Sequence, residues 1–317
     1  MNYEKELLKA HKKYEEKKYE EAVLIYDNLF CKISNPTINL IKEYAICLQK
    51  RLRYEESLKL TDIVLLKNPN DADMLLNYCI CLGKQNKHAE ALELYERILK
   101  FNEKYRIQIG YYAYLLGRTG NYEKADYYYK IALEYESQNL WYISHYAFFL
   151  QKLKRYREAE MYYKKAIKND SNNSWLIKRY AFFIYEMSGK DSAYLYYKDL
   201  ITRDLSNYNY YINAAELAII SNDKDIAFRF LCKTDKLDKP LVIEIILLFY
   251  WGVYFICKKE YEKLNDSIKE MSLLRKNYTS YIDRDLTDLE EYVNNNFDKF
   301  QRKLYITIFN IMSTGVK

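Results

Sequence analysis

The 317-residue sequence predicts an all-α protein built as a solenoid of helix pairs, and three observations support this fold class. The whole chain holds only 7 glycines and 3 prolines, too few for the turns of a many-stranded sandwich or barrel. Apolar residues recur on one helical face, as Ile143, Tyr146, Ala147 and Leu150 do. A short motif also returns about every 34 residues, which is typical of a helix-turn-helix repeat array.

The repeated motif places one small residue in each unit. It reads KYEEA, RYEES, KHAEA, NYEKA, RYREA, KDSAY and KDIAF, and its small residues are Ala22, Ser57, Ala91, Ala125, Ala159, Ala193 and Ala227. Successive members lie 35 residues apart once and 34 residues apart thereafter. We therefore predict seven repeats over residues 3–241, each consisting of two helices.

Two further columns of residues follow the same period. Small residues recur 12 positions upstream of the motif, at Ala10, Ala45, Cys79, Ala113, Ala147, Ala181 and Ala215. Tyrosines recur four positions after it, at Tyr26, Tyr95, Tyr129, Tyr163 and Tyr197. Small residues where helices cross and large ones where they meet are what close helix packing requires. Both columns are predicted to be buried.

The period slips after the seventh unit. Residues 242–280 are interpreted as a divergent eighth helical repeat, and residues 281–317 as C-terminal helices that cap the last apolar face. A dimerisation surface in these C-terminal helices is the alternative. The apolar stretch Leu241–Cys257 is 17 residues long and carries Glu244, whereas a membrane span needs about 20 apolar residues. A buried core helix is therefore expected there, and no membrane partner.

These columns resemble the tetratricopeptide repeat, and the resemblance covers residues 3–241. It implies a right-handed superhelix with a concave groove lined by the first helix of each pair. Such grooves can clamp an acidic C-terminal peptide with Lys, Asn and Arg side chains at set places. Here Lys42 and Asn77 match that pattern, but Ile46, Ile107 and Tyr111 fill the other places. This mode of peptide binding is therefore not expected.

The charge balance excludes some classes of partner and compartment. Lys and Arg number 50 against 44 Asp and Glu, and the resulting charge of +6 is spread along the chain. That is no nucleic-acid footprint in itself. The first 21 residues are charged throughout and lack the apolar stretch of a secretory signal. We expect a cytoplasmic protein with reduced cysteines.

No group of residues predicts catalysis. His11, His88 and His145 belong to three different repeats, so no two of them share a unit. Cys79 and Cys81 lie two positions apart on a helix, where their side chains diverge, and both are expected in or near the core. Dinucleotide, phosphate-loop and HExxH motifs do not occur in the sequence. The protein is predicted to be no enzyme, with no cofactor and no metal.

The candidate ligand-binding residues lie on the first-helix face opposite the packed stripe, which in this family lines the groove. They are mostly aromatic, with cationic neighbours, and comprise Tyr111, Tyr114, Trp141, His145, Phe148, Trp175, Arg179 and Phe182. Tryptophan, tyrosine and arginine dominate binding hot spots. The alternative is that tight curvature or packing against the C-terminal cap buries some of these rings.

The leading hypothesis is an adaptor that binds an extended or helical peptide segment of another protein in this aromatic groove. Single-stranded nucleic acid is one alternative, because aromatic rings interleaved with Arg118, Lys152 and Arg179 also describe a stacking channel. The modest charge and Glu186 favour peptide. A peptide-sensing regulator is the other alternative, with the C-terminal tail as its output segment. A homodimer through that tail stays open.

Overall fold

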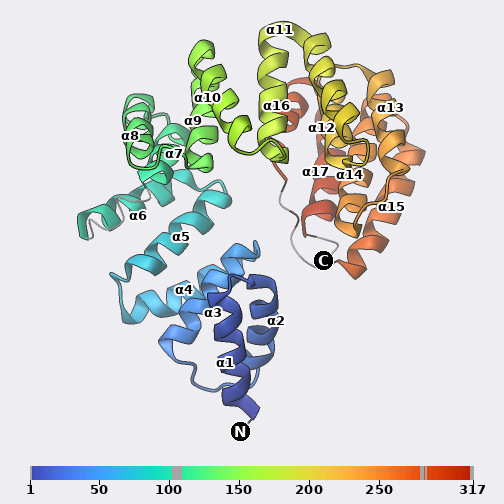
Figure 1. Cartoon of the computed structure of the whole chain (residues 1–317). Helices are drawn as coiled ribbons and strands as arrows, with labels where there is room; N and C mark the ends of the chain where they lie inside the picture. The colour runs from blue at the N-terminus through green and yellow to red at the C-terminus, as the bar shows by residue number, and fades with distance from the viewer. Residues whose placement is uncertain (1, 102–108, 279–281, 283, 315–317) are drawn as a thin grey trace. The chain divides into compact units, whose positions relative to one another are not determined.

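The computed structural model describes residues 2–101, 109–278, 282 and 284–314, and every regular element in these ranges is an α-helix (Figure 1). The chain divides into two compact units, Met1–Phe149 and Leu150–Lys317. Ile107, one of the residues considered for the peptide clamp, lies outside the described ranges. Each unit is built from antiparallel helix pairs, as the 34-residue period predicts.

Unit 1 contains four complete helix pairs and most of a ninth helix. The helices are α1 (Asn2–Glu15), α2 (Tyr19–Phe30), α3 (Ile38–Lys50), α4 (Tyr54–Lys67), α5 (Ala72–Lys84), α6 (His88–Phe101), α7 (Ile109–Arg118), α8 (Tyr122–Tyr135) and α9 (Leu140–Lys152), whose last residues belong to unit 2. Three of the first helices begin at a side-chain cap, in which Thr37, Asp71 and Asn139 accept a hydrogen bond from a backbone N–H three residues ahead.

Unit 2 continues the series of pairs. Its helices are α10 (Tyr156–Asn169), α11 (Ser174–Arg203), α12 (Tyr208–Ile220), α13 (Lys224–Asp235), α14 (Leu241–Lys258), α15 (Tyr261–Asn277), α16 (Thr287–Asn296) and α17 (Lys299–Thr314). Helix α11 is two helices joined at Gly189, whose φ of 81° and ψ of 175° are not helical. The sixth predicted pair is therefore present within α11.

The turn inside each helix pair contains one residue in the left-handed region of the backbone. These residues have φ between 57° and 85° and are Lys17, Leu52, Asn86, Gly120, Lys154, Gly189, Asn222 and Lys259. Only two of them are glycines. The left-handed region disfavours any residue with a Cβ atom, so six of the eight turns hold a side chain in a conformation that glycine adopts more readily.

The predicted core columns are confirmed as buried. All seven small residues of the motif column, and all seven of the column 12 positions upstream, have no exposed surface. The five second-helix tyrosines are at most 1% exposed. Cys79 and Cys81 are fully buried too, as predicted, and burial raises the pKa of the Cys81 thiol to about 11. The sequence period thus corresponds to a continuous series of packed helices within each unit.

Helix α14 is the one helix among the described residues with the length and composition of a membrane span, with a mean hydropathy of 1.9 over 18 residues. Half of this stretch is buried inside the protein. Its partners include α15 and α17 (Figure 1), and Ile245, Phe249 and Val253 have no exposed surface. This packing favours the predicted core helix.

The last two helices cover the end of unit 2. Helix α17 packs on α14 and α15, while α16 contacts α12. Ile308 and Met312 of α17 are fully buried in the same apolar cluster as Leu264 and Met271 of α15. The tail therefore covers apolar surface of the eighth pair, which is what a cap does. The repeat ranges 3–241, 242–280 and 281–317 remain our interpretation of these helix pairs.

Candidate functional site

An aromatic cluster on the first helices α7 and α9 is the main candidate site of unit 1. Tyr111 and Tyr114 of α7 stack with ring centroids 5.7 Å apart. Trp141 of α9 lies 6.2 Å from the first ring and 5.9 Å from the second. His145 stacks on Trp141 at 3.9 Å, and its Nδ1 lies 2.9 Å from the Trp141 carbonyl oxygen. Four of the eight predicted residues are thus brought together.

The cluster presents one ring to solvent and buries others beneath it. Trp141 is 37% exposed, whereas Tyr114, His145 and Phe148 are half-buried. The Tyr111 hydroxyl donates to the Cys79 carbonyl oxygen at 3.2 Å, and burial raises the pKa of Tyr111 well above its usual value. Tyr111 is therefore fixed in the interior side of the cluster, and Trp141 is the ring that solvent reaches.

A cation and a neutral histidine flank the same rings. The exposed Arg118 donates through Nε to Nε2 of His88 at 3.1 Å. Burial, and then the Arg118 charge, lower the pKa of His88 to about 4, so its ring is neutral at pH 7. The His88 ring meets Tyr114 edge-on at 5.8 Å. Sequence reasoning did not include His88 in the site, because it lies on a second helix, α6, and not on a groove-lining helix.

A hollow of about 480 Å³ lies on the first helices at the other end of unit 1. Its walls come from α1, α3 and α5 and include Tyr14, Asn39, Lys42, Ile46, Asp73 and Asn77. Lys42 pairs with Asp71 at 2.8 Å. The Asn77 amide donates to two buried hydroxyl oxygens of α4. The two residues that match the acidic-peptide clamp are therefore engaged inside the protein, and the hollow carries charges of both signs.

Unit 2 corrects the prediction at Arg179 and Phe182. The sequence placed both on an open groove, but they are only 1% and 4% exposed. Arg179 lies under the segment that precedes α16 and donates through Nε to Asp285 at 2.9 Å. Trp175 is half-buried, and its indole N–H donates to the same carboxylate at 2.5 Å. The alternative considered from the sequence, burial against the C-terminal tail, therefore applies to Arg179 and Trp175. Phe182 is buried instead in a cluster with Tyr210 and Leu217 of α12.

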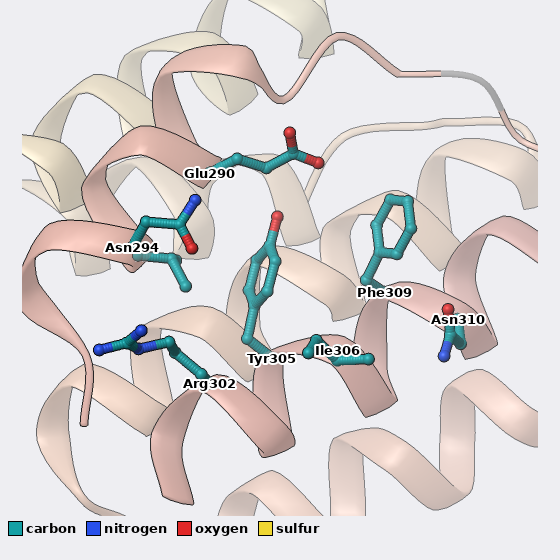
Figure 2. Close-up of a pocket in the computed structure, with 8 residues that line it drawn as sticks. Glu290, Asn294, Arg302, Tyr305, Ile306, Phe309 and Asn310 are labelled. Atoms are coloured by element: carbon teal, nitrogen blue, oxygen red, sulfur yellow. The ribbon is translucent and has the colours of Figure 1, made fainter. Parts of the chain in front are cut away.

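A second hollow, of about 340 Å³, lies between α16 and α17 (Figure 2). Its apolar wall includes Val293, Ile306 and Phe309. The buried Tyr305 hydroxyl points toward Glu290 in Figure 2 and has no hydrogen-bond partner among the described residues. Ile306 is 55% exposed. The hypothesis of a dimer through the C-terminal helices concerns this surface and stays a prediction.

The side chains of these surfaces can stack on a ligand or form hydrogen bonds with it. Within the described ranges, no group of three His, Cys, Asp or Glu residues is arranged to hold a metal ion. The aromatic cluster offers stacking, the neutral His88 ring and the Arg118 cation. These groups suit binding of an apolar or aromatic side chain next to an acidic or carbonyl group.

Comparison with known proteins agrees with the fold. A family model for the coatomer epsilon subunit matches residues 13–107, less than a third of the chain. No curated protein sequence matches the chain. A tetratricopeptide repeat protein from Parabacteroides merdae is similar in structure, with a TM-score of 0.59 and 15% identity, over 80% of this chain and 98% of that one.

A chain in the crystal structure of the APC/C hetero-tetramer Cut9-Hcn1 is similar as well. Its TM-score is 0.52 at 12% identity, over 96% of this chain and 55% of that one. At such identities the likeness concerns the fold alone. The helix pairs, the buried columns and these two structures agree, and the chain has the helical-repeat fold of tetratricopeptide repeat proteins.

Proposed function

We propose that the protein is a non-catalytic interaction module, and that unit 1 binds a peptide segment of a partner protein against the aromatic cluster of α7 and α9. The observation that carries the proposal is the exposed edge of Trp141 on a base of three packed rings. A rigid ring held in place loses little conformational entropy when a ligand covers it. Trp141 is therefore the expected anchor.

The charges on the other first helices of unit 1 favour peptide over nucleic acid. The hollow on α1, α3 and α5, at the other end of the unit, mixes Lys42 and Lys50 with Glu43 and Asp73, whereas a strand-binding channel tracks phosphates with an excess of cations. Glu43 is also held by Tyr26, whose hydroxyl donates to it at 2.7 Å. A peptide backbone, with donors and acceptors in alternation, matches such a mixed surface.

The test begins with selection of peptides from a random phage library on the immobilised full chain. Titration calorimetry then measures the selected peptides against wild type and Trp141→Ala. Loss of an anchor costs about 2 kcal/mol or more, so we expect binding at least about thirtyfold weaker. Tyr135→Ala is the matched control, because Tyr135 is an aromatic residue of α8 that is 77% exposed and lies outside the cluster.

Two results would contradict the proposal. One is a set of selected peptides that binds wild type and Trp141→Ala equally well. The other is tight binding of a thymidine 20-mer that weakens steeply between low and high salt, which would assign the cluster to single-stranded nucleic acid.

A further inference from the structure

The segment that precedes α16 is bound by side chains of α11 that lie more than 100 positions earlier in the chain. Asp285 accepts hydrogen bonds at Oδ2 from the Trp175 indole at 2.5 Å and from Arg179 Nε at 2.9 Å. Lys178 donates to the Asp285 backbone oxygen. Arg179 also reaches Asp288, with Nη1 to Oδ2 at 2.6 Å. One helix face thus binds both carboxylates of an Asp-x-x-Asp sequence.

The cations of this face are buried beneath the segment. Lys178 is 3% exposed and Arg179 is 1% exposed. Burial by itself would raise the pKa of Asp285, but the charges of Arg179 and Lys178 outweigh it and hold that pKa far below its usual range. A segment without the carboxylates would take from the buried Arg179 the two acidic partners that it binds here, which is strongly unfavourable. Lys178 would keep its buried pair with Glu216, at 2.6 Å. The face is therefore selective for acidic segments.

A second set of contacts recognises the arginine next to Asp285. Arg284 donates to Asn213 Oδ1 and to the Tyr250 hydroxyl, both at 2.8 Å. Its guanidinium lies over the Tyr250 ring, 5.0 Å from the centroid. The Tyr250 hydroxyl in turn donates to the buried Glu216 at 2.5 Å. Helices α12 and α14 thus supply an acidic and aromatic place for a cation, directly beside the basic place on α11.

The segment makes polar contacts through Arg284, Asp285 and Asp288, and its Leu286 side chain, 3% exposed, lies in the apolar cluster of α14 and α17. Thr287 donates through its N–H and its hydroxyl to Asp285 Oδ1, at 3.2 and 2.8 Å, so the carboxylate is saturated with donors. Helix α17 has further apolar contacts of its own, because Ile308 and Met312 are buried with α14 and α15. A competing segment must therefore replace the Leu286 contact as well as the polar contacts, while Ile308 and Met312 keep α17 in its place.

We propose that this face of unit 2 is a binding site for peptide segments of the form Arg-Asp-x-x-Asp, which residues 284–288 fill in this structure and for which an acidic segment of a partner protein competes. The tethered segment has a high effective concentration, of the order of millimolar. Partner binding is therefore weak until the tail is released. The site is separate from the aromatic cluster of unit 1, so either proposal can fail without the other.

The first experiment uses a fluorescein-labelled peptide of residues 284–293, RDLTDLEEYV, and the full chain carrying Asp285→Asn with Asp288→Asn. Fluorescence anisotropy should show this peptide binding the variant at least tenfold more tightly than wild type. The same peptide with both aspartates changed to asparagine should bind the variant at least tenfold more weakly. A cooperative melt by circular dichroism checks that the variant is folded.

A second measurement uses wild type and keeps the proposal testable if the variant does not fold. The chain has three tryptophans, so indole ¹⁵N–¹H spectra report on Trp175, Trp141 and Trp251 separately. Millimolar peptide should shift the Trp175 signal and leave the other two in place. A folded variant that does not bind the peptide, binding that ignores the aspartates, or a wild-type shift at Trp141 in place of Trp175 would each overturn the proposal.

Discussion

Arg179 on α11 and Asp285 ahead of α16 form a largely buried ion pair between residues 106 positions apart in the sequence, with the Asp285 side chain 21% exposed. Arg179 is among the largest fully buried side chains of the protein. Its Nε, Nη1 and Nη2 all donate to carboxylates of the same segment. The carboxylates of the C-terminal segment and the guanidinium of Arg179 therefore neutralise each other's charge.

Truncation of Arg179 should destabilise unit 2 strongly. Arg179→Ala leaves Asp285 without its main partner, and removing one member of a buried pair costs about 3–5 kcal/mol of unfolding free energy. Urea denaturation measures the loss. The control is Arg203→Ala, whose pair with Asp199 is mostly exposed and should cost about 1 kcal/mol or less. Equal losses in the two variants would contradict the structural role of the buried pair.

Acid should weaken the same contact. The pKa of Asp285 is lower in the folded protein than in the unfolded chain, so the folded state favours the charged form. Its contribution to stability is complete above pH of about 4 and is lost as pH falls below that value. Urea denaturation from pH 7 to pH 2 should therefore show the gap between wild type and Asp285→Asn closing only below about pH 4. A difference in stability between wild type and Asp285→Asn that stays constant from pH 7 to pH 2 would contradict the contribution of this ion pair.

Trp141 and Trp175 should differ in their effect on stability, although the sequence gives them equivalent positions. Trp141→Ala removes a ring with an exposed edge and should cost about 1 kcal/mol. Trp175→Ala also removes a hydrogen bond to the charged carboxylate of Asp285 and should cost about 2–3 kcal/mol. Thermal melting of the two single variants measures and compares these losses of stability. Equal losses would mean that the tail contact contributes nothing at Trp175.

Gly110 should not tolerate a side chain. A Cβ atom at this position of α7 would lie 2.4 Å from ring atoms of Tyr142 on α9. Overpacking of this kind costs about 1–3 kcal/mol, so Gly110→Ala should lower the free energy of unfolding by that amount. A smaller residue opposite should relieve the clash, and Tyr142→Leu is the matched partner for a double-mutant cycle. Strictly additive effects of the two substitutions on the free energy of unfolding would show that there is no steric conflict between the two positions.

Deletion of residues 282–317 should cause aggregation. The deletion uncovers Ile245, Phe249 and Val253 of α14, all of which have no exposed surface in the intact chain. Exposed apolar patches promote association between protein molecules. Size-exclusion chromatography with light scattering is the measurement. A soluble monomer with an unchanged melting temperature would mean that α17 is no cap.

The helix pairs and their cores could be predicted because they rest on contacts between neighbouring repeats. Ala147 and Tyr163, for example, belong to columns that recur every 34 residues, and both are fully buried. The position of Arg179 could not be predicted in the same way, because its partner Asp285 lies outside the period. The sequence DRDLTDLEE held a signal, namely five carboxylates within nine residues. Nothing local specifies which helix those carboxylates meet.

The left-handed turn residues allow the number of repeats in the chain to change without a new turn conformation. Leu52 and Asn86 hold the same turn conformation one repeat apart, with φ of 63° and 62°. Loss of residues 53–86 would join α3 to α6 through one such turn, so neither a new loop nor a new backbone geometry is required. The number of helix pairs can therefore grow or shrink by duplication or deletion, in steps of one repeat, while every junction stays as it was.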